Sequence, residues 1–438
     1  MDINGTVIIL LPIVLTLILV ILGLPIPYSI GFAGLVTMFL EGIGGAALNR
    51  LGLIPFSTFY GLNWIALPLF LLMAFIISET GMSKDVFEAA NNWVSRLRGG
   101  LLVSSLATQA GLAASMGSST TTMLTMATVA VPEMERLGYK KAFGAATLLA
   151  GGVLGPLIPP SIPAIVYAML AEQSINELFI AGILPGIILL GLLSLVVILL
   201  CRQRLEAAPR LAEVSWRDRV YSLRKVWPIL ALMVGVLGSI MSGIATATEA
   251  GAIGVIVSLA VAATRRDFRL INLKRAMLQA ATMTGMVGVM VIACNFFSYV
   301  VAITGFAEKI VALIQGQGWP PLAVIIIINL IVLALGCIMD AMAIMMVAIP
   351  LFIPIVKALG LDLIWFGILM IVNTEIGLIT PPIGLNLFVA TSACRVSTGE
   401  LARASVPFIA VLIGFLGLLI AFPQISLYLP NLVRYGVQ

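Results

Sequence analysis

Two proline pairs interrupt long apolar segments of this chain. Pro159-Pro160 lies in the motif GPLIPPS, and Pro381-Pro382 lies in GLITPPIG, 222 positions further on. Proline has no backbone N–H and clashes with the preceding turn, so a helix cannot run through either pair. At membrane depth, unwound backbone is tolerated only where it is buried in protein or lines an aqueous cavity. Both breaks therefore predict an ion or substrate site.

The composition supports a membrane setting for these breaks. Of the 438 residues, 61% are hydrophobic and only 10% are charged, whereas soluble proteins have about 25% charged residues. The apolar runs approach the ~20 residues that a helical span needs, and such unbroken runs favour helices over the alternating strands of a barrel. We predict an all-α polytopic membrane protein.

Basic residues concentrate in two segments, 202–225 and 265–275. Because lysine and arginine mark the cytoplasmic side of membrane proteins, both segments are expected to face the cytoplasm, in contact with membrane lipid. This placement explains the net charge of +5 without a nucleic-acid partner. Basic residues are also more numerous in 84–141, around the segment before the first proline break, than in 309–357, around the segment before the second, which predicts opposite orientations of these two segments in the membrane.

A polar or glycine-containing turn precedes each proline pair and predicts a re-entrant hairpin. The first tip, 117–122, has the sequence GSSTTT, and the second, 336–341, contains GCIMD. Glycine and hydroxyl residues favour chain reversal. Further prolines and glycines match between the two halves at the same spacing of 222, so we predict two inverted repeats, each with a re-entrant hairpin and a broken helix. An ordinary pair of spans around GSSTTT remains the alternative.

Each hairpin tip, placed against a helix break, forms a candidate cation site. Helix C-terminal carbonyls coordinate cations, and hydroxyl and carbonyl oxygens are hard ligands that suit sodium. No other cofactor is expected. Because basic residues are scarce at membrane depth, hydroxyls and amides are the candidate substrate ligands. The candidate sodium ligands are Gly117, Ser118, Ser119, Gly155 and Ile158 at the first site and Gly336, Asp340, Gly377 and Thr380 at the second; the candidate substrate ligands are Thr122, Ser161 and Asn386. Close helix packing is the alternative use of these glycines.

Three acidic residues occur in apolar surroundings. Asp340 is expected to be functional, because a carboxylate at membrane depth costs at least ~2.5–3.5 kcal/mol. It is predicted to be the only full charge close to an ion site. The role of Glu375 can be functional or structural. Glu249 is expected to orient a helix start beside Thr246.

The sequence does not support an enzyme. It contains no Walker loop, no HExxH motif and no histidine, and its four cysteines are far apart. An ion channel is a second possibility, but paired hairpins in inverted repeats favour alternating access.

The motifs GSSTTT, GPLIPPS, TATEAGAIG and NTEIGLITPPIGLNLF resemble the large membrane subunit of tripartite ATP-independent periplasmic (TRAP) transporters, over residues 5 to 430. The resemblance implies the ion-transporter superfamily fold and a sodium-coupled elevator mechanism in a bacterial inner membrane. It also implies a separate small four-helix membrane subunit and a periplasmic substrate-binding protein. The substrate would be an organic acid such as a C4-dicarboxylate, a sialic acid or another sugar acid. A stand-alone organic-anion or cation symporter of the same superfamily is the alternative. The departure from the family pattern is Cys337-Ile338-Met339, where small polar residues are more common.

The resemblance divides the chain into a scaffold and a moving transport domain. Residues 83–98 and 304–316 are expected to be amphipathic helices, and residues 50–60 a connector. The predicted parts are scaffold helices over 1–79; first-repeat transport elements over 80–175 with a break at 155–163; scaffold helices over 176–303; second-repeat transport elements over 304–396 with a break at 377–384; and a C-terminal scaffold helix over 397–438.

Overall fold

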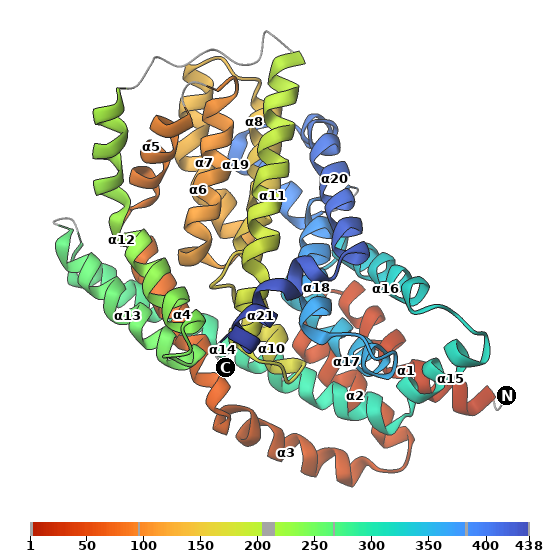
Figure 1. Ribbon diagram of the computed structural model, residues 1–438. Helices are drawn as coiled ribbons and strands as arrows, with labels where there is room; N and C mark the ends of the chain where they lie inside the picture. The colour runs from red at the N-terminus through yellow and green to blue at the C-terminus, as the bar shows by residue number, and fades with distance from the viewer. Residues whose placement is uncertain (1–2, 95–96, 204–214, 266–267, 382–383, 437–438) are drawn as a thin grey trace.

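The computed structural model describes residues 3–94, 97–203, 215–265, 268–381 and 384–436 (Figure 1). Within these ranges the regular secondary structure is helical, which confirms the predicted all-α class. In chain order the helices are α1 (Ile3–Ile21), α2 (Ile26–Leu40), α3 (Gly44–Tyr60), α4 (Leu62–Glu79), α5 (Ser83–Val94), α6 (Gly100–Met116), α7 (Ser119–Arg136), α8 (Lys141–Gly152), α9 (Leu154–Leu157), α10 (Ile162–Leu170), α11 (Ile175–Gln203), α12 (Trp216–Met241), α13 (Ala247–Thr264), α14 (Leu270–Ile303), α15 (Phe306–Gly316), α16 (Pro321–Gly336), α17 (Ala341–Ala358), α18 (Leu363–Ile379), α19 (Leu385–Cys394), α20 (Thr398–Ala421) and α21 (Gln424–Gly436).

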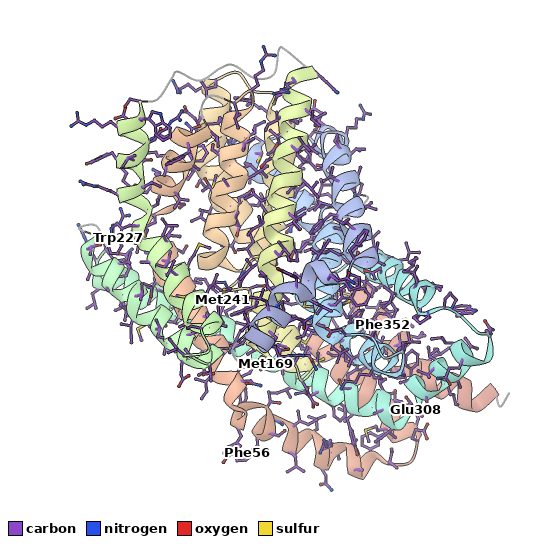
Figure 2. All side chains as sticks on the ribbon, viewed as in Figure 1. Phe56, Met169, Trp227, Met241, Glu308 and Phe352 are labelled. Carbon is purple, nitrogen blue, oxygen red and sulfur yellow. The ribbon has the colours of Figure 1, made fainter. Side chains whose placement is uncertain are left out.

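Several helices have the length and apolar character of membrane spans. Among the described residues six helices qualify, namely α11, α12, α13, α14, α17 and α20, and the number rises to eight if each of two bent helix pairs counts as one span. Large apolar side chains such as Phe56 and Trp227 lie on the outside of the molecule (Figure 2). An apolar exterior is typical of a protein whose surroundings are lipid.

The prediction that residues 50–60 form a connector is wrong, because they belong to α3. Ala47 and Ile54, two helical turns apart, are buried in one cluster with Phe296 and Val300 of α14. This tertiary contact stabilises a helix whose sequence mixes polar and apolar residues.

Three other predicted boundaries also need correction. The basic segment 202–225 already contains the start of α12 at Trp216, because the Ser215 hydroxyl accepts a hydrogen bond from the Asp218 N–H and caps the helix. Residues 204–214 of that segment lie outside the described residues. The basic segment 265–275 likewise enters α14 at Leu270. Beyond residue 397 the chain forms two helices, because Pro423 follows the end of α20.

Helices end at both proline breaks. The first break lies between α9 and α10 and bends the chain by 45°. The second lies between α18 and α19, and Pro382 lies outside the described residues. The predicted tips fall where α6 gives way to α7 and where α16 gives way to α17.

The broken helices occupy the interior. Every residue of α18 from Leu363 to Ile379 is buried, as is α8 from Gly144 to Gly152. A helix that is apolar on all sides is stable only inside a protein or a bilayer. In Figure 1, α6, α7, α8 and α19 gather between α12 and α20, and α14 crosses beneath them.

Two glycines of α11 hold the first break against that helix. A Cβ at Gly182 would lie 2.4 Å from the Leu157 carbonyl oxygen, and one at Gly186 would lie 2.5 Å from Cγ1 of Ile158. This small-xxx-small spacing lets the unwound backbone pack directly on the helix.

Gly182→Ala should therefore lower the stability of the protein by about 1–3 kcal/mol, because the Leu157 carbonyl belongs to the backbone and must shift. Gly191→Ala on the same helix is the control, since nothing lies within 4 Å of its Cβ position. It should be neutral or stabilising, because alanine is the better helix former. Thermal unfolding of the two purified variants measures the difference, and equal midpoints would contradict the close packing.

Candidate functional site

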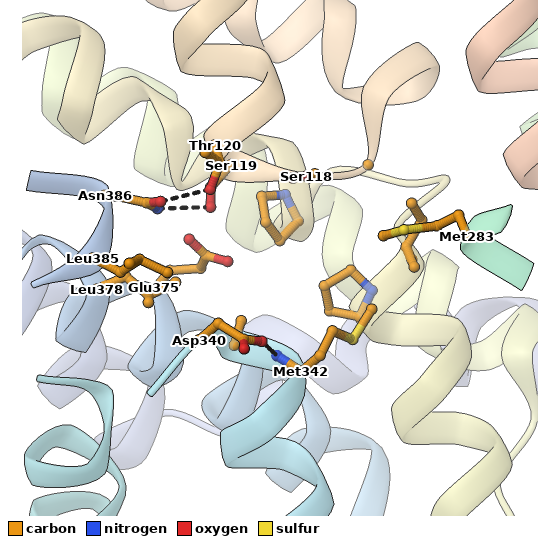
Figure 3. Close-up of a pocket in the computed structure, with 15 residues that line it drawn as sticks. Ser118, Ser119, Thr120, Met283, Asp340, Met342, Glu375, Leu378, Leu385 and Asn386 are labelled. Carbon is orange, nitrogen blue, oxygen red and sulfur yellow. Dashed lines mark hydrogen bonds between the residues drawn. The ribbon is translucent and has the colours of Figure 1, made fainter. Parts of the chain in front are cut away.

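A cavity of about 170 Å³ lies where the two halves of the chain meet (Figure 3). It is lined by residues of the first tip, the starts of α10 and α19, the second tip, α14 and α18. Its polar side chains are Ser118, Ser119, Thr120, Asp340, Glu375 and Asn386.

Four helix N-termini converge on this cavity. The first two residues of each helix line it: Ser119 and Thr120 of α7, Ile162 and Pro163 of α10, Ala341 and Met342 of α17, and Leu385 and Asn386 of α19. The first N–H groups of a helix lack partners within that helix, and the helix dipole is positive at this end. The arrangement therefore places the partial positive charges of four helix ends on the cavity wall.

The first tip packs tightly on the first break. Gly117 has a φ of +56°, a left-handed conformation that favours glycine. A Cβ at Gly155 would lie 3.0 Å from the Thr122 hydroxyl oxygen and 3.4 Å from the Ser118 carbonyl oxygen. The structure thus brings Gly117, Ser118 and Gly155 of the predicted first sodium site close together. The side chain of Ile158, by contrast, packs on Gly186 of α11.

At the predicted second sodium site, two glycine backbones touch. A Cβ at Gly336 would lie 2.6 Å from the Gly377 Cα atom, so neither position accommodates a side chain without movement. The Thr380 hydroxyl donates to the Ile376 carbonyl at 2.6 Å, within its own helix. Asp340 caps α17, since its Oδ1 accepts from the Met342 N–H at 3.0 Å and the Ala343 N–H at 3.1 Å, and it also lines the cavity.

Hydrogen bonds tie the first tip to the half-helix after the second break. The Thr120 hydroxyl donates to Asn386 Oδ1 at 2.6 Å, and Asn386 Nδ2 donates to Ser119 Oγ at 2.9 Å (Figure 3). Asn386 was predicted as a substrate ligand, whereas Thr120 was missed. The hydroxyl run GSSTTT contained the signal, but nothing in the sequence indicates which hydroxyl faces α19.

The other predicted substrate ligands lie just outside this cavity. Thr122 is buried, and its hydroxyl donates to the Ser118 carbonyl at 2.7 Å. Ser161 is buried and caps α10 by accepting from the Ala164 N–H at 3.2 Å. Both support the tip and the break that form the cavity wall.

Glu375 stands out among the acidic residues. Its side chain is 1% exposed and lines the cavity, and its Oε2 atom has no hydrogen-bond partner within the described part of the chain. The prediction that Asp340 is the only full charge near an ion site is therefore wrong. Glu249, by contrast, forms a capping box with Thr246 at the start of α13, as expected.

The donor set of the cavity consists of oxygen atoms. Hydroxyl, amide and carboxylate oxygens lie on its wall, and among the described residues no lysine or arginine does. In the described ranges, no three histidine, cysteine, aspartate or glutamate side chains gather as a metal cluster would require. Oxygen atoms of these kinds are hard ligands.

Comparison with known proteins places the chain among transport proteins. Residues 13–425 match the family described as "Tripartite ATP-independent periplasmic transporter, DctM component". The C4-dicarboxylate TRAP transporter large permease protein DctM of Pseudomonas aeruginosa is 36% identical, over 92% of this chain and 94% of that protein. The sialic acid TRAP transporter large permease protein SiaM of Vibrio cholerae is 27% identical, over 94% and 96%.

The fold also resembles that of a transporter of known structure. The YdaH transporter of Alcanivorax borkumensis superposes with a TM-score of 0.59, at 17% sequence identity, over 86% of this chain and 89% of that one. At this identity the likeness concerns the fold alone.

The contact between the two halves can be tested by a double-mutant cycle. Thr120→Val and Asn386→Ala should show a coupling energy of roughly 0.5–1.5 kcal/mol in the free energy of unfolding, because each removes one partner of the same hydrogen bond. Thr128→Val is the matched control in α7, since its exposed hydroxyl bonds only to the Thr125 carbonyl. The effects of Thr128→Val and Asn386→Ala on the free energy of unfolding should be additive. If the effects of Thr120→Val and Asn386→Ala were additive as well, this would contradict the contact.

Proposed function

This chain belongs to the DctM family of TRAP transporter components, and we propose that it is a sodium-coupled permease subunit that imports an organic acid. Its relatives are large permease proteins of transporters, so the chain is a membrane transport protein and not an enzyme. The observation that carries the proposal is the cavity at which four helix N-termini meet oxygen-lined walls from both halves of the chain.

The helix N-termini are suited to the acidic group of the substrate. With no basic side chain on the cavity wall, backbone N–H groups and the amide of Asn386 are the available donors for a carboxylate. Thr122 and Ser161 hold the tip and the break in place behind the wall. A C4-dicarboxylate, a sialic acid or another sugar acid is the proposed substrate class, in line with the names of the relatives.

Sodium is the proposed coupling ion. The first ion would be held by oxygens of Gly117, Ser118, Ser119 and Gly155, and the second by Asp340 and the backbone around Gly336, Gly377 and Thr380. A cation beside Asp340 offsets part of the free energy that its carboxylate loses by leaving water. Binding of both ions would order the two tips and so prepare the cavity for the substrate.

The proposed mechanism is of the elevator type. The two hairpins and two broken helices would move together as a transport domain, because Asn386 and the glycine contacts join them. The remaining helices would form the scaffold of an inverted repeat in a bacterial inner membrane, apart from α11, which would move with the first break because the Leu157 carbonyl packs on Gly182. A small four-helix membrane subunit and a periplasmic substrate-binding protein are the proposed partners.

Asp340→Asn tests the sodium coupling. Asparagine keeps the oxygen that caps α17 but removes the charge, so we expect the half-saturating sodium concentration to rise roughly tenfold. Ser119→Ala, which removes only a neutral oxygen, should produce a smaller rise. The measurement is uptake of the binding protein's ligand by proteoliposomes that contain all three components, titrated with sodium against potassium.

Three results would each contradict a part of the proposal. Uptake that is equal in sodium and potassium would exclude sodium coupling. An unchanged sodium midpoint for Asp340→Asn would make this carboxylate structural and leave the second site to backbone carbonyls alone. Uptake by the purified chain without a binding protein would indicate a stand-alone symporter.

A further inference from the structure

Glu375 is a buried carboxylate that the two predicted sodium sites do not use. It lies in α18, where every residue is buried, and only 1% of its side chain is exposed. A carboxylate in such surroundings is strongly destabilising unless a cation or several hydrogen bonds compensate for the lost hydration. Oε2 has no such partner among the described residues.

The carboxylate points into the cavity rather than into the core. Figure 3 shows it reaching into the space between the Ser119–Asn386 pair above and Asp340 below. Ser119 Oγ accepts from Asn386 Nδ2 and interacts with Glu375 through its hydroxyl. Oε2 of Glu375 is itself a buried atom, and it lacks a hydrogen-bond partner among the described residues.

Other oxygen atoms with spare capacity border the same space. Asn386 Oδ1 accepts one hydrogen bond, from Thr120, and a carbonyl oxygen has two lone pairs. Asp340 contributes a second negative charge, and its Oδ1 is already committed to the α17 cap. The cavity therefore contains two carboxylates and no basic side chain.

This charge distribution is unfavourable for an organic anion. In their ionised forms, Asp340 and Glu375 would repel an acid that enters the cavity, at short range and in a low dielectric. The dipoles of the helix N-termini offset only part of that repulsion, because each amounts to about half a charge. A bound cation would remove the repulsion and supply the partner that Oε2 lacks.

We propose that Glu375 is the carboxylate ligand of a further sodium ion, bound in the cavity together with Ser119 Oγ and Asn386 Oδ1, and that this ion bridges Glu375 to the acidic group of the substrate. The proposal rests on the proposed function. The site differs from the two sites at the tips and breaks, because it joins residues of both halves. Sodium and substrate then raise each other's affinity reciprocally.

Thermal unfolding of the purified full-length chain, without substrate, tests the site directly. In potassium, Glu375→Gln should unfold at a higher temperature than the unmodified protein, because glutamine removes the uncompensated charge. In sodium at equal ionic strength, the unmodified protein should gain more stability than the variant. Asp362→Asn is the matched control, since Asp362 is an exposed carboxylate that caps the same helix. It should leave the sodium response unchanged.

A second variant covers the case in which Glu375→Gln does not yield folded protein. Glu375→Asp keeps the charge but withdraws it by one methylene, and it should raise the half-maximal sodium concentration for stabilisation several-fold. In the complete reconstituted system, Glu375→Gln should also reduce the number of charges moved per substrate by one.

Three outcomes would overturn the inference. If Glu375→Gln is less stable than the unmodified protein in potassium and gains as much stability from sodium, Glu375 has a structural role. Uptake of a proton in place of sodium would exclude the ion proposed here. If uptake by Glu375→Gln depends on sodium and moves the same number of charges per substrate as uptake by the unmodified system, this site alone is rejected. If uptake by the unmodified system does not depend on sodium, the proposed function itself is rejected.

Discussion

The structure depends on one constraint, namely that unwound backbone at membrane depth must be enclosed by protein. Two proline breaks create such backbone, and close glycine contacts enclose it. Gly182 of α11 receives the Leu157 carbonyl, and the Gly336 and Gly377 backbones touch directly. The helix that leads into the second break, α18, is buried along its whole length.

The same breaks generate the cavity. A helix that stops inside the protein presents its N-terminal N–H groups where the next segment begins, and α10 and α19 both start in this way. The hairpin tips add the starts of α7 and α17, so four positive helix ends and two carboxylates share one small space. Partial positive charges for an acid and full negative charges for a cation are the combination that a symport site requires. Asn386 joins the two halves at this point.

Local chemistry made much of the fold predictable. Prolines and glycines act on their own neighbours, so the positions of the breaks and the tips followed from the sequence. Residues 50–60 were assigned wrongly because Ala47 and Ile54 gain their helical stability from α14, far along the chain. Thr120 and Glu375 were missed or left open for a related reason. Their roles depend on Asn386 and on the shared cavity, and one sequence does not show which distant residues meet.

The central proposal is that sodium ions bound at the two tips and breaks order the walls of the cavity between them. Hydrogen–deuterium exchange of the backbone amides in 117–122 and 336–341 tests this directly, on the chain in lipid with its membrane partner, in sodium and in potassium. Exchange reports local opening, so ordering by the ion appears as protection. The account predicts that sodium slows exchange in both tips over the same concentration range. Exchange that is equal in the two salts, or that changes at one tip alone, would contradict it.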